Sequence, residues 1–261
     1  MIYWVFRRID WREAQRLVMQ LPLWSPVVAA LFFNLSQVLS VYRTNLFYRS
    51  LGIRMRWWTQ LKLYYLGMFY NLFIPGGIGG DAYKVFWLQK RYKARTRSLV
   101  QVSLTDRLSG LVGILLWLGV FFWLTPWAGQ WKVSVPAAAV WLLCVPVLAW
   151  GVRRLLSAGY PVVWQAVLPS VGIQFAQLLC IAALLWGWGV REGLFLYGFV
   201  FLLSSIVTVI PVTIGGVGAR EFTFLTFAPL LGIAPSVSVT VALLFFLLTA
   251  VSSLPGGLVR L

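Results

Sequence analysis

The chain has 261 residues, 61% hydrophobic and only 11% charged, yet its 22 Lys and Arg against 6 Asp and Glu give a net charge of +16. A soluble nucleic-acid-binding protein is excluded, because it needs a charged and hydrated surface, and a disordered basic tail is excluded by the 15 Trp, 10 Tyr and 18 Phe. We therefore predict an integral, multi-pass protein of the cell (inner or plasma) membrane whose cations lie mainly in loops.

Stretches without a charged residue outline the predicted spans. A helix needs about 20 apolar residues to cross the bilayer core, and most of these stretches are long enough. Because backbone groups in lipid must be satisfied within a helix or a closed barrel, and the pattern does not alternate as in a barrel, we predict an all-α helix bundle. The stretches are 17–42, 63–80, 108–131, 133–152, 155–190, 193–219 and 222–259.

Residues 1–20 precede the first predicted span and carry both basic and acidic side chains. We predict an interfacial, amphipathic N-terminal segment. The alternative is the remainder of a segment whose preceding spanning helix is missing from this chain. Residues 21–261 are predicted to form a single transmembrane domain.

The stretch 63–80 is broken by a proline and glycines. A helix there must end before Pro75, which leaves about 12 helical residues, too few to cross. Basic residues typical of cytoplasmic loops flank it on both sides, at 43–62 and at 84–107. We therefore predict a re-entrant hairpin over 63–90 that opens to the cytoplasm. The glycines of its turn are Gly76, Gly77, Gly79 and Gly80.

The remaining segments follow by alternation. Each crossing reverses the side on which the next loop lies, and the basic loops mark the cytoplasmic side. The predicted order is 21–42 inward, 108–126 outward, 135–152 inward, 161–187 outward, a broken run 193–232 that returns to the outside, and 236–258 inward.

The second break resembles the first. Residues 210–216 read IPVTIGG and residues 74–80 read IPGGIGG, with five of seven positions identical. The predicted hairpins open to opposite sides, as in an inverted-topology repeat whose discontinuous helices meet at a binding site. Chance recurrence or close helix packing is the alternative. The turn residues of the second break are Pro211, Gly215, Gly216 and Gly218.

Ionisable residues beside these breaks are the candidate site residues, because a charge in the membrane is costly unless it has a function. Glycine turns at helix starts expose N–H groups that attract anions, and Lys84 and Arg220 lie one turn further on. Asp81 and Asp106 also have a simpler role as helix caps, Arg107 as a membrane anchor, and Asn71 as a bond between helices. The candidate headgroup-binding residues are Asn71, Asp81, Lys84, Asp106, Arg107, Arg220 and Glu221.

The chain shows no constellation of catalytic residues. It has no His, no paired carboxylates on one segment and no nucleophile elbow. Cys144 and Cys180 lie in apolar runs and are interpreted as small hydrophobic residues. We therefore predict no enzyme, no cofactor and no metal. The basic loop 90–97 is expected to attract anionic headgroups and to fix the topology.

Three motifs occur in an order that resembles the lysylphosphatidylglycerol synthase transmembrane family, the flippase region of the multiple peptide resistance factor. They are the segment from Asn71 to Lys84, the acid–arginine pair Asp106–Arg107, and the segment from Pro211 to Glu221. The resemblance covers residues 30–258 or so. Two parts of the family pattern, an upstream spanning helix and a soluble aminoacyl-transferase domain, are not seen in this sequence. The resemblance therefore does not imply that this chain attaches lysine to lipids. Asp81 and Lys84 replace the more usual Glu and Arg.

The residues and the resemblance together predict a lipid flippase that moves anionic or phosphate-bearing headgroups between leaflets. Arg220, Lys84 and Arg107 would hold the phosphate, while Asp81, Asp106 and Glu221 would balance charge or hold an amino group. The expected partner is a membrane phospholipid or a polyprenyl-phosphate-type lipid, not a nucleic acid. A homo-oligomer, or a partner synthase or glycosyltransferase, is left open. The alternative functions are a membrane lipid-modifying enzyme or its subunit, and a secondary transporter of a small anion.

Overall fold

The computed structural model describes residues 9–74, 78–155, 160–209 and 218–261, and the regular elements within these ranges are all helices. This confirms the predicted all-α class. In chain order the elements are α2 (Trp11–Gln20), α3 (Trp24–Ser50), α4 (Trp57–Phe73), α5 (Gly79–Tyr92), α6 (Thr96–Phe122), the 3-10 turn η2 (Pro126–Gly129), α7 (Trp131–Leu155), α8 (Tyr160–Gly187), α9 (Leu194–Val209), α10 (Ala219–Leu230) and α11 (Pro235–Gly257).

Among the described residues, four helices are long and apolar enough to cross a membrane. They are Trp24–Ser50, Thr96–Phe122, Val162–Gly187 and Pro235–Gly257. The spans expected near 161–187 and 236–258 agree closely with the last two. The first two are longer than expected, because the prediction stopped at Arg43 and started after Arg107, whereas both charges lie inside helices.

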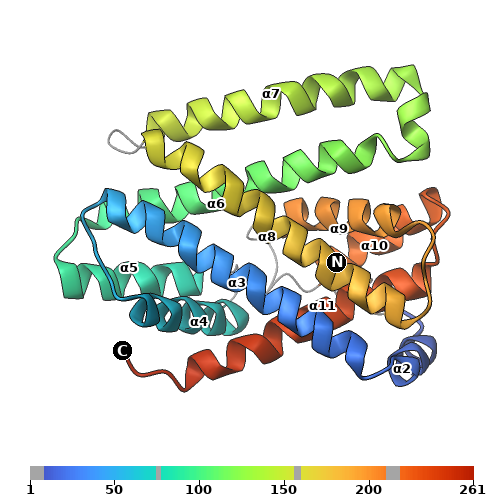
Figure 1. Ribbon diagram of the computed structural model, residues 1–261, viewed down its shortest axis with the longest axis horizontal. Coiled ribbons are helices and arrows are strands. Elements are labelled where there is room, and N and C mark those ends of the chain that lie inside the picture. Colours follow the sequence, from blue (N-terminus) through green and yellow to red (C-terminus); the bar gives the residue numbers. More distant parts are fainter. Residues whose placement is uncertain (1–8, 75–77, 156–159, 210–217) are drawn as a thin grey trace.

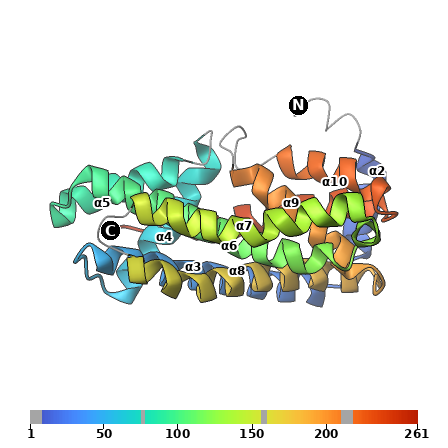
Figure 2. The same cartoon turned by 90° about the horizontal axis from the view of Figure 1, so that it is seen from above.

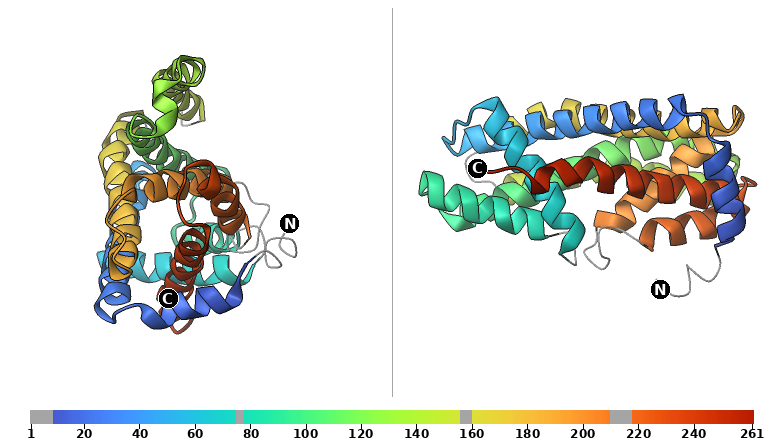
Figure 3. Two further views of the ribbon diagram at one scale, coloured as in Figure 1. Left: turned by 90° about the vertical axis from the view of Figure 1, so that its right-hand side faces the viewer. Right: turned by 90° about the horizontal axis from the view of Figure 1, so that it is seen from below.

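The helices run mainly along the long axis of the molecule. Antiparallel helices α3 and α8 pack side by side and form the front layer (Figure 1). Seen from above, α5, α9 and α10 lie on the opposite side of the molecule from this layer (Figure 2). Helix α7 packs mainly on α6 and projects away from the rest (Figure 3).

Two helical hairpins occupy opposite ends of the long axis. Helices α4 and α5 pack together at one end, and α9 and α10 pack together at the other (Figures 1 and 2). Helix α4 ends at Phe73, before Pro75 as predicted, but it begins at Trp57 and has 17 residues, so it is roughly 26 Å long. Most of each turn lies outside the described residues, and with it Pro75, Gly76, Gly77, Pro211, Gly215 and Gly216. Of the other predicted turn residues, Gly79 and Gly80 are the first two residues of α5, so their assignment to the turn was wrong, and Gly218 directly precedes α10.

Exposed basic residues gather where α3 and α5 end and where α4 and α6 begin. The positive-inside rule predicts that this end of the molecule is the cytoplasmic one. The helix directions agree with the predicted alternation, since α6 and α8 run away from this end while α3, α7 and α11 run towards it (Figure 1). The residues are Arg49, Arg54, Arg56, Lys90, Arg91, Lys93, Arg95 and Arg97.

Helix α2 has 10 residues and is amphipathic. Asp10 caps it by accepting hydrogen bonds from the N–H groups of Arg12 and Glu13, both at 3.1 Å. The helix packs against α11, and Nε1 of Trp188 donates to the carbonyl of Leu17 at 2.8 Å. These contacts fix α2 at the end of the bundle opposite the basic residues.

Candidate functional site

The first hairpin is closed by two glycines that let α4 and α5 touch. A Cβ atom on Gly80 would collide with the carbonyl of Gly67, and one on Gly67 would lie 2.5 Å from Cε of Lys84. The side chain of Asn71 accepts a hydrogen bond from the N–H of Gly80 at 2.7 Å. Of the two roles considered for Asn71, the structure shows the bond between helices, which satisfies an N–H that lacks an intrahelical partner.

Asp81 joins this hairpin to α6. Its carboxylate lies 2.7 Å from Nη2 and 2.8 Å from Nε of Arg107, and 3.4 Å from Nζ of Lys84. The Lys84 ammonium also lies 4.6 Å from the centroid of the Tyr64 ring. Lys84 is only 9% exposed, so its charge depends on these two neighbours.

The charges of this triad support one another. Burial raises the pKa of the Asp81 carboxyl, but Lys84 and Arg107 outweigh burial and hold that pKa below its usual value. Burial lowers the pKa of Lys84, but Asp81 and other neighbours reverse the effect and raise that pKa overall. Both side chains are therefore charged at neutral pH.

A second ion pair lies next to the first along α6. Arg43 of α3 donates from Nε and Nη2 to the two oxygens of Asp106, at 2.9 and 3.2 Å. Its Nη1 donates to Ser170 of α8 at 3.1 Å, and the Thr44 hydroxyl donates to Asp106 at 3.2 Å. The pair therefore ties α3, α6 and α8 together.

These pairs correct the predicted helix caps. Helix α6 begins at Thr96, so Asp106 and Arg107 lie in its third turn and not at its start. Helix α5 begins at Gly79 without a side-chain cap, so Asp81 does not cap it. Both acids instead meet a guanidinium group of a neighbouring helix, which brings two nitrogens within 3.2 Å of each carboxylate.

Arg43 is the residue of this site that the sequence analysis missed. We assigned it to the topology-setting cations, but it is 7% exposed and paired. A signal was present in the sequence, since Ser36, Ser40 and Arg43 recur at helical spacing and would share one polar face. An arginine that continues such a face is a candidate for a buried pair.

Replacing Arg43 with lysine is expected to lower the free energy of unfolding by about 1–3 kcal/mol. Lysine keeps the charge but cannot bond both oxygens of Asp106 and the Ser170 hydroxyl at once. Thermal unfolding of the purified protein in detergent measures the change. Arg49→Lys is the matched control, because Arg49 is exposed on the same helix; equal shifts in the two variants would contradict the assigned role of Arg43.

The second hairpin holds its cation differently. The Arg220 guanidinium lies 4.6 Å from the ring centroids of both Phe201 and Phe245, and its Nη1 lies 3.2 Å from the Ser204 hydroxyl. Glu221 is 1% exposed and accepts a hydrogen bond from the N–H of Gly218 at 2.7 Å. Glu221 therefore caps α10, while in the described part of the chain the Arg220 charge is held by two aromatic faces and a hydroxyl.

The charges on and around the first hairpin do not cancel. Arg43, Lys84 and Arg107 face the two carboxylates of Asp81 and Asp106, which leaves an excess of one positive charge. Arg220 adds a further cation from the second hairpin. Guanidinium and ammonium groups held in this way can bind an anion such as a phosphate.

Comparison with known proteins identifies one family. The family model described as the lysylphosphatidylglycerol synthase TM region matches residues 1–161. This range contains the first hairpin and both ion pairs but not the second hairpin. No curated protein and no solved structure matches the chain.

Proposed function

The chain belongs to the lysylphosphatidylglycerol synthase transmembrane family, and from this premise we propose that it is a lipid translocase. It would move anionic or phosphate-bearing headgroups between the leaflets of the cell membrane. The observation that carries the proposal is a pair of helical hairpins from opposite ends of the bundle, each with a cation in the first two turns of its second helix, Lys84 in α5 and Arg220 in α10.

We propose that both hairpins are re-entrant. Residues 63–90 would open to the cytoplasm and residues 193–232 to the outside, as the two halves of an inverted repeat. Supporting this, α5 has 14 residues, α9 has 16 and α10 has 12, all fewer than a spanning helix needs, while α4, with 17, is at the lower limit. Non-helical turns at depth are tolerated when protein or a wet cavity surrounds them.

The headgroup phosphate would bind the cations of both hairpins. Lys84 and Arg107 are paired with Asp81 when no lipid is bound. A phosphate that binds these two cations would separate them from Asp81. Because an uncompensated buried charge is costly, the Asp81 carboxylate would then need another cationic partner. An amino group on the headgroup would supply that partner. The acyl chains would remain in lipid, so only the headgroup needs a polar path.

Leaflet exchange in vesicles tests this function. The purified chain is reconstituted into vesicles that contain a fluorescent phosphatidylglycerol, and loss of the inner-leaflet signal to a membrane-impermeant quencher is followed. We expect exchange well above that of protein-free vesicles. Exchange no faster than in protein-free vesicles, or a chemically altered lipid in the product, would overturn the proposal.

Replacing Arg220 with glutamine is expected to slow this exchange by about tenfold or more, which corresponds to about 1.4 kcal/mol of lost phosphate binding. Glutamine keeps a polar side chain but removes the charge that Phe201 and Phe245 surround. Arg191→Gln is the control, since Arg191 is an exposed cation outside both hairpins. If the two variants slow exchange equally, Arg220 has no special part in headgroup binding.

A further inference from the structure

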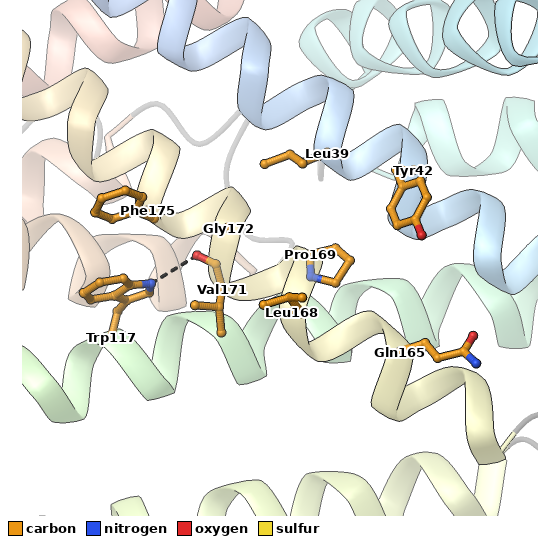
Figure 4. A pocket seen from close by; sticks show the side chains of 9 residues that line it. All are labelled: Leu39, Tyr42, Trp117, Gln165, Leu168, Pro169, Val171, Gly172 and Phe175. Carbon is orange, nitrogen blue, oxygen red and sulfur yellow. Dashed lines mark hydrogen bonds between the residues drawn. The ribbon is translucent and has the colours of Figure 1, made fainter.

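An apolar groove runs along the front layer of the molecule, apart from the charged site. It has a cavity volume of about 540 Å³ and lies between α3, α6 and α8 (Figure 4). This volume is in the range of small-molecule pockets, roughly 300–1,000 Å³. The lining residues are Leu39, Tyr42, Trp117, Gln165, Leu168, Pro169, Val171, Gly172 and Phe175.

The groove exists because small or ring-closed residues form its floor. Pro169 and Gly172 of α8 leave space between α3 and α6, and a Cβ atom on Gly172 would meet only Leu39, at 3.4 Å. Trp117 closes the far end, where it stacks on Phe175 at 5.5 Å and donates from Nε1 to the carbonyl of Val171 at 3.1 Å. The groove is therefore a fixed feature of the packing.

The two ends of the groove differ in polarity. Trp117 and Phe175 make one end aromatic and apolar, while Tyr42 and Gln165 place a hydroxyl and an amide at the other (Figure 4). Because Pro169 has no N–H, the backbone carbonyl of Gln165, one turn earlier, lacks its usual hydrogen bond within the helix. This adds a polar group at the same end of the groove. An occupant with an apolar tail and a polar head would match this order.

The polar end of the groove leads towards the basic end of the bundle. Arg49 is exposed two turns beyond Tyr42 on α3, and a spacing of seven residues keeps both on one helix face, about 10 Å apart. Trp164, next to Gln165, is 51% exposed, as expected of an aromatic residue at the membrane interface. The headgroup region of the membrane is therefore expected to begin just beyond Tyr42 and Gln165, on the side of the basic residues.

We infer that this groove is a binding site for one acyl chain of an anionic phospholipid in the cytoplasmic leaflet. Both α3 and α8 are long and apolar enough to span the membrane, so their outward faces contact lipid. The chain lies along Pro169 and Gly172, its ester region meets Tyr42 and Gln165, and Arg49 attracts its phosphate. This lipid stays bound and is not the translocated one.

Photo-crosslinking in vesicles tests this site. The full chain is reconstituted with a phosphatidylglycerol that carries a photoreactive group in its acyl chain, and crosslinked peptides are identified by mass spectrometry. We expect enrichment at 39–42 and 165–175 over the rest of the lipid-facing helices. Even labelling of all lipid-facing helices, or a crosslink from this face to a second copy of the chain, would overturn the inference.

Two variants separate groove binding from general lipid contact. Gly172→Leu fills the groove and should lower crosslinking there about fivefold or more, or about 1 kcal/mol, whereas Gly151→Leu, at a glycine with open space around it, should not. Arg49→Gln leaves the groove open and should remove the preference for phosphatidylglycerol over phosphatidylcholine. Unchanged groove labelling in Gly172→Leu, or an unchanged preference in Arg49→Gln, would contradict the site, whether or not the protein translocates lipid.

Discussion

Replacing Asp81 with asparagine is expected to lower the free energy of unfolding by about 2–4 kcal/mol and to abolish leaflet exchange. The change leaves the buried Lys84 and the neighbouring Arg107 without the carboxylate they share. The loss should fall somewhat below that of a fully buried pair, because the Asp81 side chain is 20% exposed. Thermal unfolding in detergent measures the stability, and the fluorescent phosphatidylglycerol assay measures exchange.

A second substitution shows whether the loss comes from unbalanced charge. Adding Lys84→Met to Asp81→Asn removes the buried ammonium and should restore part of the stability. Exchange should stay absent, because both groups belong to the proposed headgroup site. A double variant no more stable than Asp81→Asn alone would contradict the pairing of Lys84 with Asp81.

Replacing Gly80 with alanine is expected to cost about 3 kcal/mol. The new Cβ would occupy the position of the Gly67 carbonyl on α4, so the two helices of the first hairpin must separate. Separation also lengthens the hydrogen bond from the Gly80 N–H to Asn71 and moves Asp81 away from Arg107. The thermal midpoint in detergent should fall, and exchange should fall with it.

Gly129→Ala is the matched control for this change. Gly129 lies in the 3-10 turn between α6 and α7, and a Cβ atom there would have open space around it. We expect its stability to match that of the unmodified chain within about 0.5 kcal/mol. A Gly80→Ala protein as stable as Gly129→Ala would show that α4 and α5 are not in close contact.

The sequence predicted the class of fold because hydrocarbon leaves few solutions for the backbone. The predicted spans 161–187 and 236–258 agree with α8 and α11 almost to the residue, and Pro75 marked the end of α4. The start of α6 was missed by several turns, because Arg107 and Asp106 ended the uncharged run. A charged residue interrupts an uncharged run in the sequence, but it can lie inside a helix when its partner is on another helix. Such a tertiary contact cannot be recognised from the local sequence.

The sequence predicted the candidate site only in part, because the partners of its charged residues lie on other helices. Asp81, Lys84 and Arg107 were all selected by their position beside a glycine turn or a long apolar run, and the structure brings the three together. The partner of Asp106 was not predicted, because Arg43 resembles the loop cations that follow it. Helix capping was assigned to Asp81 and Asp106 from local sequence alone, which cannot weigh a guanidinium supplied by a distant segment.

Leaflet exchange of fluorescent phosphatidylglycerol by a Lys84→Met, Arg220→Gln double variant tests the translocation site most directly. The variant removes one cation from each hairpin and leaves Asp81 paired with Arg107, so it should fold. We predict exchange at the rate of protein-free vesicles from a protein with an unchanged thermal midpoint in detergent. Exchange at the rate of the unmodified chain would contradict a headgroup path that runs between the two hairpins.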